Sequence, residues 1–213
     1  MNEICVTQLG EYFMAERQIF SVIPSPSCWG SERIFLVQGR ACDWTMTGLL
    51  HQTIETTAAS HPNHDAFRCQ GESLTYSALN AKSNCLAHLL VEEGTRRGDR
   101  VGVYMPRCLA SAVAVFGIMK AGAAYVSIDP HTPIDSLWRL IDDCGIRHLI
   151  THDQHSEKLG LLLAGAHELS LLVGSSVEFD GSTRVRPWET LDQFPAGHAT
   201  DVPSGEKDLA YIM

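Results

Sequence analysis

The chain has 213 residues, of which 45% are hydrophobic and 19% charged, a composition typical of a soluble globular protein of one or two domains. Its 25 acidic residues outnumber its 16 basic ones, and the formal net charge of −9 argues against nucleic acid or an anionic membrane as the main partner. No apolar run is long enough for a secretory signal or a membrane span, and the seven cysteines lack C-x-x-C spacing, so we expect a cytoplasmic protein with reduced thiols.

Two regions of the chain differ in pattern. In residues 1–45, the two prolines and the glycine of SVIPSPSCWG (residues 21–30) interrupt any long element, and we can attach no chemistry to this region. We expect an N-terminal extension of unknown role there. From residue 46 to residue 213 the apolar spacing becomes regular, and it predicts a single domain.

The regular region begins with a predicted helix and a hairpin. Leu50, Ile54 and Ala58 follow each other at intervals of four, which places them on one helical face, and Pro62 ends the helix. The alternating residues on either side of Gln70-Gly71 then predict two short strands joined by a tight turn.

A second helix and a strand follow. Thr75 can cap the start of the helix with its hydroxyl group, and Gly94 can close its C-terminal end. Val101, Val103 and Met105 alternate with other residues, so they should lie on one side of a strand.

The next helix, around residues 108–122, is apolar nearly all round, which predicts burial on several sides. A strand over residues 123–130 follows it. Thr132 and Pro133 then resemble the N-cap and first residue of a further helix, which Gly145 would end. The inner face of that helix should contain Leu137, Leu140, Ile141 and Cys144.

The rest of the chain continues the alternation of strands and helices. It predicts a strand over residues 147–151, a weaker helix over residues 157–163, a strand over residues 169–173, a polar linker over residues 197–207 and a final strand over residues 208–213. Such alternation implies an α/β fold with a mostly parallel sheet, right-handed crossovers and helices flanking the sheet.

Three familiar site motifs are absent. The strand that contains Val101 is followed by MPRCLAS rather than by the G-x-G-x-x-G of a dinucleotide site, and no complete phosphate-binding P-loop occurs. GSSVEFDG (residues 174–181) does not fit the G-x-S-x-G of a nucleophile elbow. These classes of site are therefore excluded.

The chain contains ten histidines, which raises the question of a metal site. His148, His152 and His155 lie close together with Asp153 between them, but their spacing matches no established ligand pattern. We interpret them as histidines of a surface loop, and we interpret His61 and His64 in the same way.

Cys108 and Lys120 are the remaining candidates for chemistry. Cys108 stands at a helix start, where the helix dipole can lower a thiol pKa, but no histidine lies near it in sequence, and a packing role is favoured. Lys120-Ala121-Gly122 could hold an anion, but a lysine that complements a helix C-terminus is the simpler interpretation. The residues alone therefore predict no catalytic, cofactor-binding or metal-binding side chain in this chain.

Three stretches in order resemble a known family. They are LTYSALN (residues 74–80), MKAGAAYVSIDP (residues 119–130) and DLAYIM (residues 208–213). They are similar to the first, the second and the beginning of the third core motif of adenylation domains in the adenylate-forming superfamily, which includes acyl-CoA synthetases, luciferases and nonribosomal peptide synthetases. The form of the second stretch most resembles the amino-acid-activating domains of peptide synthetases.

Two positions depart from the motifs of this family. Ala78 stands where the first motif commonly has an acidic residue, which would complete a capping box, so we expect a slightly weaker cap. Ser127 stands where peptide synthetases usually have proline. Neither difference is expected to abolish the fold.

The resemblance implies a two-step reaction with ATP and Mg²⁺. A carboxylate attacks the α-phosphate of ATP, and the resulting acyl-adenylate passes its acyl group to the thiol of coenzyme A or of a carrier protein's phosphopantetheine. In the family, the loop that holds the phosphates directly follows the strand that DLAYIM resembles, and the sequence ends at Met213. We therefore expect residues 46–213 to be the N-terminal part of the large domain, and to be inactive alone.

A non-catalytic role is the alternative to this hypothesis. In that case the open sheet edge at residues 208–213 would associate with another chain of a synthetase assembly, because unpaired strand edges favour pairing.

Overall fold

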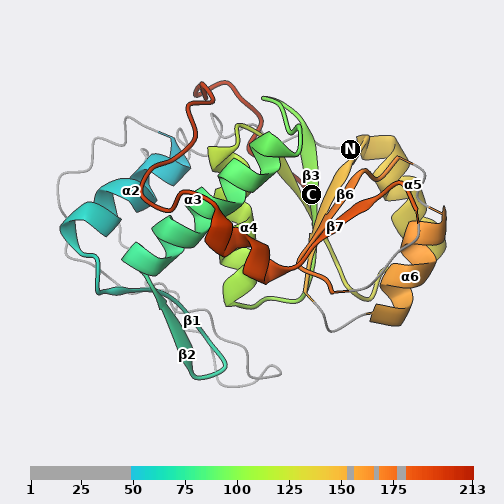
Figure 1. The fold of residues 1–213 in the computed structure, drawn as a ribbon, viewed down its shortest axis with the longest axis horizontal. Helices are drawn as coiled ribbons and strands as arrows, with labels where there is room; N and C mark the ends of the chain where they lie inside the picture. Colours follow the sequence, from blue (N-terminus) through green and yellow to red (C-terminus); the bar gives the residue numbers. More distant parts are fainter. Residues whose placement is uncertain (1–48, 153–155, 166–167, 177–180) are drawn as a thin grey trace, which may run out of the picture.

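The computed structural model describes residues 49–152, 156–165, 168–176 and 181–213, so the predicted extension over residues 1–45 lies outside the described residues. The described chain forms a parallel sheet with helices on both faces and a small hairpin at one side (Figure 1). The predicted α/β class is therefore confirmed.

The first described helix, α2 (Leu50–Ser60), ends just before His61 and Pro62, as predicted. Its expected inner face is only partly correct. Ile54 is buried, but the Leu50 side chain at the first helical position is 53% exposed. Helical spacing identifies which residues share a face. Which of these residues are buried depends on the neighbouring elements that cover the helix.

The hairpin consists of β1 (Asp65–Cys69) and β2 (Glu72–Thr75), which pair antiparallel. Gln70 and Gly71 connect them with φ values of 51° and 86°. Two consecutive positive φ values are typical of the tight turn whose twist suits a two-residue hairpin, so the predicted turn is confirmed.

Helix α3 (Tyr76–Glu92) begins and ends where the sequence predicts. The Thr75 hydroxyl accepts a hydrogen bond of 3.2 Å from the amide of Ala78, so the cap forms although Ala78 replaces the usual acidic residue. Gly94 has a φ of 100° just after the helix, and the amide of Thr95 donates to the Leu90 carbonyl, which closes the end of the helix.

Six parallel strands form the main sheet in the order β7-β6-β5-β3-β4-β8. Their bounds are β3 (Arg100–Tyr104), β4 (Ala124–Ile128), β5 (His148–Thr151), β6 (Leu171–Val173), β7 (Arg184–Arg186) and β8 (Tyr211–Ile212). The sequence did not predict β7 or the short 3-10 helix η2 (Trp188–Gln193), because a three-residue strand with an arginine at each end shows no apolar run.

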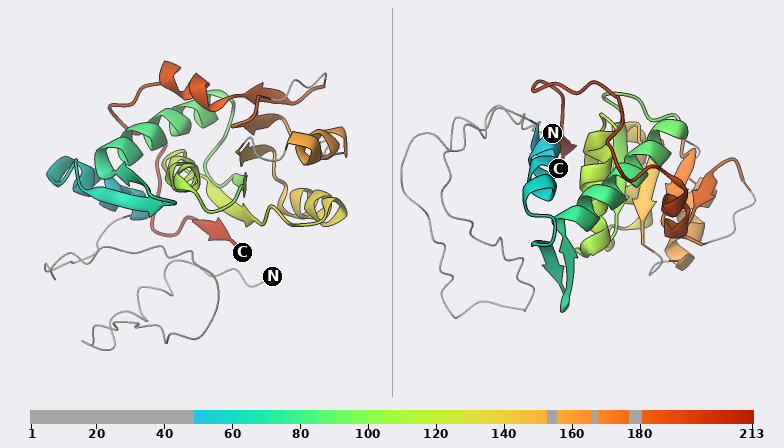
Figure 2. Two further views of the ribbon diagram at one scale, coloured as in Figure 1. Left: turned by 90° about the horizontal axis from the view of Figure 1, so that it is seen from below. Right: turned by 60° about the vertical axis from the view of Figure 1, so that its left-hand side comes forward.

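The helices cover two faces and create two cores. Helix α4 (Leu109–Lys120) joins β3 to β4 and packs with α3 on one face, whereas α5 (Ile134–Cys144) and α6 (Ser156–Gly165) pack on the other (Figure 2). A Cβ atom on Gly117 would lie 2.7 Å from Leu86, so this glycine allows α3 and α4 to approach closely. The predicted burial of α4 on several sides is confirmed.

The start of α5 differs by one residue from the prediction. Pro133 has a ψ of 147°, which is extended rather than helical, so it is the N-cap and the helix begins at Ile134. Gly145 ends the helix in the left-handed conformation with a φ of 60°, as expected. Leu137, Ile141 and Cys144 are buried, and Leu140 is half-buried against the same core.

Four cysteines lie within the described residues, and all four are free thiols: Cys69, Cys85, Cys108 and Cys144. Among the helices of the described ranges, none is both long and apolar enough to cross a membrane.

Candidate functional site

The two ends of the parallel sheet are chemically different. Helices α4, α5 and α6 begin where β3, β4 and β5 end, so helix N-termini meet at the carboxyl edge and helix C-termini meet at the amino edge. The connection after β3 runs to one face of the sheet and the connection after β4 runs to the other face. In open α/β sheets ligands bind outside the carboxyl ends of strands at such a switch point, so this edge is the candidate site.

Tyr104 and Lys158 fix the loop between β4 and α5 at the carboxyl edge. The Tyr104 hydroxyl donates to the Pro130 carbonyl at 3.1 Å, and the Lys158 ammonium donates to the carbonyls of Pro130 at 2.9 Å and Thr132 at 2.5 Å. The ammonium also lies 5.7 Å from the centre of the Tyr104 ring, within range of a cation–π contact. A cation is thus held beside the start of α5.

Strand β8 pairs a distant part of the chain with β4. The Tyr125 amide of β4 donates to the Ala210 carbonyl at 3.1 Å, and the Tyr125 and Tyr211 rings stack with centres 5.6 Å apart. Burial, with a smaller contribution from Tyr211, raises the pKa of Tyr125. Because β8 is parallel to β4, it points towards the carboxyl edge.

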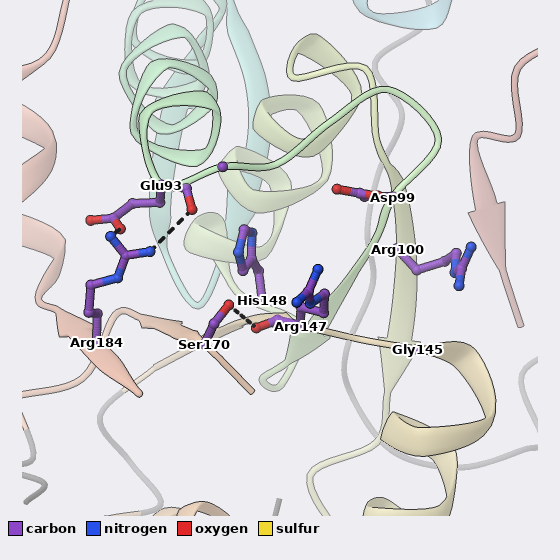
Figure 3. A pocket seen from close by; sticks show the side chains of 9 residues that line it. Glu93, Asp99, Arg100, Gly145, Arg147, His148, Ser170 and Arg184 are labelled. Atoms are coloured by element: carbon purple, nitrogen blue, oxygen red, sulfur yellow. Dashed lines mark hydrogen bonds and ion pairs between the residues drawn. The ribbon is translucent and has the colours of Figure 1, made fainter. Parts of the chain in front are cut away.

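A cavity of about 280 Å³ lies at the opposite, amino edge (Figure 3). Its walls are the end of α3 and the starts of β3, β5, β6 and β7. The lining residues are Glu93, Gly94, Asp99, Arg100, Gly145, Arg147, His148, Ser170 and Arg184.

Most of the charge near this cavity has a structural role. The buried Glu93 carboxylate pairs with Arg184 at 2.5 Å and with Arg186 at 2.8 Å. Arg184 also donates to the Glu93 carbonyl at 3.3 Å, and Arg100 donates to the Cys144 carbonyl at 2.6 Å. These arginines therefore satisfy the carbonyls at the ends of α3 and α5, where cations are favourable.

His148 corrects one sequence prediction. It is the first residue of β5 and is buried, and its Nδ1 atom forms a hydrogen bond of 2.7 Å with the Thr95 hydroxyl. Burial lowers the pKa of His148, with opposing contributions from Asp99, which raises it, and Arg184, which lowers it. The interpretation as a surface-loop histidine is therefore wrong for His148. Its partner Thr95 is 53 residues away in sequence, and sequence spacing does not indicate such a contact.

The other histidines that the structure describes form no metal-binding cluster. His152 is half-buried at the end of β5, whereas His155 and Asp153 lie outside the described residues. His61 and His64 are exposed, with ring centres 5.0 Å apart, which confirms their surface position. No group of three metal-ligating side chains is found in the described part of the chain.

Lys120 is the second correction, because its role goes beyond complementing a helix end. Its side chain is fully buried, and its ammonium donates to the Asn80 side chain at 2.5 Å, the Asn84 side chain at 2.7 Å and the Asn80 carbonyl at 3.3 Å. A Glu55 carboxylate oxygen lies 3.8 Å away. Burial lowers the pKa of Lys120 to about 8, against a smaller raising effect of Glu55.

The sequence did carry a signal for this cluster. Asn80 and Asn84 lie four residues apart on the face of α3 that packs against α4, and Lys120 ends an otherwise apolar helix. Polar side chains on apolar faces predict a buried hydrogen-bonded network. Cys108, by contrast, is half-buried at the start of α4 and packs against the first core, in agreement with the predicted packing role.

The three family-like stretches are physically connected. Asn80 belongs to the first stretch and Lys120 to the second, and they bind each other. The second stretch contacts the third where the Tyr125 amide donates to the Ala210 carbonyl at 3.1 Å, and Asp208 at the start of the third stretch accepts hydrogen bonds from Arg97, at 2.9 Å and 2.8 Å.

Comparison with known proteins agrees with this arrangement. Residues 54–213 match the family described as AMP-binding enzyme. The chain belongs to the AMP-binding enzyme family. Its first and second motif-like stretches meet at Lys120, and its third contributes β8.

Three relatives of this AMP-binding chain illustrate the match. Surfactin synthase subunit 2 of Bacillus subtilis is 37% identical over 83% of the chain and 4% of the relative. Gramicidin S synthase 1 of Brevibacillus brevis is 28% identical over 84% of the chain and 15% of the relative. The solved structure of the nonribosomal peptide synthetase FmoA3, in its α-methyl-L-serine-AMP bound form, superposes with a TM-score of 0.63 at 26% identity over 78% of this chain and 17% of that one.

These AMP-binding relatives are much longer than the chain, which spans between 4% and 17% of their lengths. The matched segment contains the parallel sheet and its two covering layers of helices.

Proposed function

We propose that residues 46–213 are the N-terminal part of the large domain of an enzyme that activates a carboxylic acid, specifically an amino acid, as an acyl-adenylate with ATP. The relatives named above are peptide synthetases, and one was solved with an aminoacyl-AMP-type ligand. The acyl group would then pass to the thiol of a carrier protein's phosphopantetheine or of coenzyme A.

The position of β8 is the observation that carries this proposal. This strand runs parallel to β4 and points towards the carboxyl edge, where the N-terminus of α5 has no side-chain cap among the described residues. Helix N-termini present free amides and partial positive charge, which suits phosphate groups. A phosphate-binding segment that followed β8 would therefore start near the carboxyl end of β4.

Within the described ranges there is no carboxylate cluster suited to Mg²⁺, and we assign neither ATP nor Mg²⁺ to a side chain of this part. The role of the described residues is to build and position the sheet. Tyr104 and Lys158 hold the loop after β4, and the Tyr125–Tyr211 stack holds β8 against β4.

Two assays test the proposal. The 213-residue chain alone should show no ATP–pyrophosphate exchange with pooled amino acids and fatty acids, and robust exchange would contradict the expected inactivity. In the second assay, residues 46–213 replace the matching segment of surfactin synthase subunit 2, which is 37% identical. The chimera should retain amino-acid-dependent exchange. If the chimera folds but loses exchange while the parent retains it, the proposed role of the segment is wrong.

One observation favours the alternative of a non-catalytic partner. Strand β7, at one edge of the sheet, carries Arg184 and Arg186, which discourage edge pairing, whereas the Tyr211-Ile212 edge of β8 is uncharged. Size-exclusion chromatography and pull-down with the tagged chain distinguish this alternative. A monodisperse monomer without a co-purifying chain would count against it.

A further inference from the structure

A segment without regular structure connects the two edges of the sheet. We call residues 194–207 the strap. It runs from η2, near β7, across α3 and towards β8 at the far edge (Figures 1 and 2). In the described chain, no backbone amide between residues 195 and 204 donates to another backbone carbonyl. Hydrogen bonds that involve side chains therefore hold the strap.

Side chains of α3 hold the first half of the strap. Asn84 donates from Nδ2 to the Ala196 carbonyl at 2.8 Å, and the Cys85 thiol donates to the Phe194 carbonyl at 3.4 Å. The Nε2 atom of His88 lies 3.1 Å from the His198 carbonyl. Further along the strap, the Thr200 hydroxyl donates to the Lys120 carbonyl at 2.5 Å.

The buried ammonium of Lys120 determines how Asn84 acts. An ammonium has only donors, so it binds the Oδ1 atom of Asn84, at 2.7 Å. The Nδ2 atom of Asn84 must then point the other way, where it meets the Ala196 carbonyl. Lys120 thus orients the Asn84 side chain, which holds the strap. The backbone carbonyl of Lys120 also accepts the hydrogen bond from the Thr200 hydroxyl.

Further contacts hold the last part of the strap, immediately before β8. Val202 lies against Gly122, where an added Cβ atom would come within 2.6 Å of Val202. Asp208 accepts two hydrogen bonds from Arg97 and a third, of 2.8 Å, from the Gly205 amide. Three residues later, Tyr211 begins β8.

We propose that Lys120, Asn84 and Thr200 are positioning residues, which fix the strap on α3 and α4 and thereby set the location and register of β8 on β4. Only the purpose of this positioning rests on the proposed function, in which β8 leads to the phosphate-binding segment. The positioning itself is a property of the chain without any reaction.

Two substitutions, each with a control, distinguish an effect on the position of the strap from an effect on the overall stability of the chain. Asn84→Asp keeps an oxygen facing Lys120 and adds a charge partner, but it replaces the donor to Ala196 with an acceptor. Thr200→Val removes the hydroxyl at nearly unchanged shape, and Thr200→Ser restores it. Thr183→Val is the matched control, because the Thr183 hydroxyl donates to the Leu169 carbonyl at 2.8 Å, outside the strap.

Amide hydrogen exchange of the 213-residue chain, measured by NMR, reports the outcome. Asn84→Asp and Thr200→Val should each speed exchange at Tyr125 and at residues 208–212 about tenfold, the effect of losing one hydrogen bond on local opening. Thr200→Ser should restore slow exchange, and the urea midpoint of Asn84→Asp should not fall.

The proposal is wrong if exchange at Tyr125 and residues 208–212 is unchanged in both variants. It is also wrong if Thr183→Val accelerates exchange there equally, because the strap would then have no special role. Since neither ATP nor substrate is present, these results do not depend on the exchange assays that test the proposed function.

Discussion

Basic side chains lie at both the amino and the carboxyl edge of the sheet, but they have different roles at the two edges. At the amino edge, Arg100, Arg184 and the buried Lys120 bind carbonyls or carboxylates of neighbouring elements. At the carboxyl edge, Tyr104 and Lys158 position a loop, while the N-terminus of α5 has no side-chain cap in the described chain. Cations at helix C-termini stabilise a fold, whereas free helix N-termini can serve a ligand.

The same contrast explains why the visible cavity is not the candidate site. The cavity lies at the amino edge, where Arg100 and Arg184 already have partners, and the candidate site lies at the carboxyl edge, towards which β8 points. The direction of the parallel strands, rather than the charged cavity, therefore indicates where a ligand would bind.

The largest expected effect comes from removing the buried cation of the amino edge. Lys120→Ala should lower the free energy of unfolding by about 3–5 kcal/mol, because Asn80, Asn84 and Glu55 lose their partner and a cavity remains. Urea denaturation measures the change. Lys120→Met fills the space and should cost less. A loss below about 1 kcal/mol in Lys120→Ala would show that the cluster contributes little to stability.

The second largest loss of stability is expected when the charge of Glu93 is removed. Glu93→Gln keeps the shape of the side chain but leaves Arg184 and Arg186 without a counter-charge, so we expect a loss of about 2 kcal/mol. Both arginines are about half exposed, and solvation limits the cost. If the urea midpoint does not change, the arginine cluster is not part of what stabilises the amino edge.

The stability of the chain should also depend on pH through Lys120. The pKa of Lys120 is about 8 in the folded chain, below its ordinary value, so the cost of burying the ammonium is present in full below pH 8. This cost disappears as the pH rises towards the unfolded pKa of 10.5, and stability should therefore increase, by on the order of 2 kcal/mol.

The charged and titratable groups that face Lys120 are Glu55 and His51 of α2, and the other partners, Asn80 and Asn84 of α3, do not titrate. The buried thiols of Cys85 and Cys144, whose pKa values are raised, also affect stability in this pH range. The measurement is therefore the difference between the wild type and Lys120→Met in urea denaturation from pH 7.5 to 10.5. A flat difference contradicts the prediction.

The smallest effect is expected at the carboxyl edge. Lys158→Met removes the donor to the carbonyls of Pro130 and Thr132, and should cost about 1 kcal/mol because the lysine is only half-buried. Hydrogen exchange should rise in the loop between β4 and α5 but not at His148. A loss as large as that of Lys120→Ala would remove the difference between the two edges.

Local rules predicted most of the fold. The turn at Gln70-Gly71, the cap at Thr75 and the helix ends at Gly94 and Gly145 all depend on neighbours within a few residues, and all were correct. The start of α5 was displaced by one residue, because the extended ψ of Pro133 keeps it outside the helix. The family resemblance placed the chain correctly, but it gave no side chain a role.

Residues whose environment comes from distant segments could not be placed. Lys120 meets Asn80, which is 40 residues away, and His148 meets Thr95, which is 53 residues away. Strand β7 forms because β6 presents an open edge, although its three residues have little strand character of their own.

Sequence patterns were enough to predict the alternation of strands and helices, their local ends and the family, because these depend on periodicity, on backbone preferences of single residues and on ordered motifs. Three features emerge from the folded structure alone: Lys120 is buried, the strap is held through Asn84 and Thr200, and β8 runs parallel to β4. The physical reason is that burial and donor–acceptor pairing arise between segments far apart in the chain, where the identity of one residue does not indicate its partner.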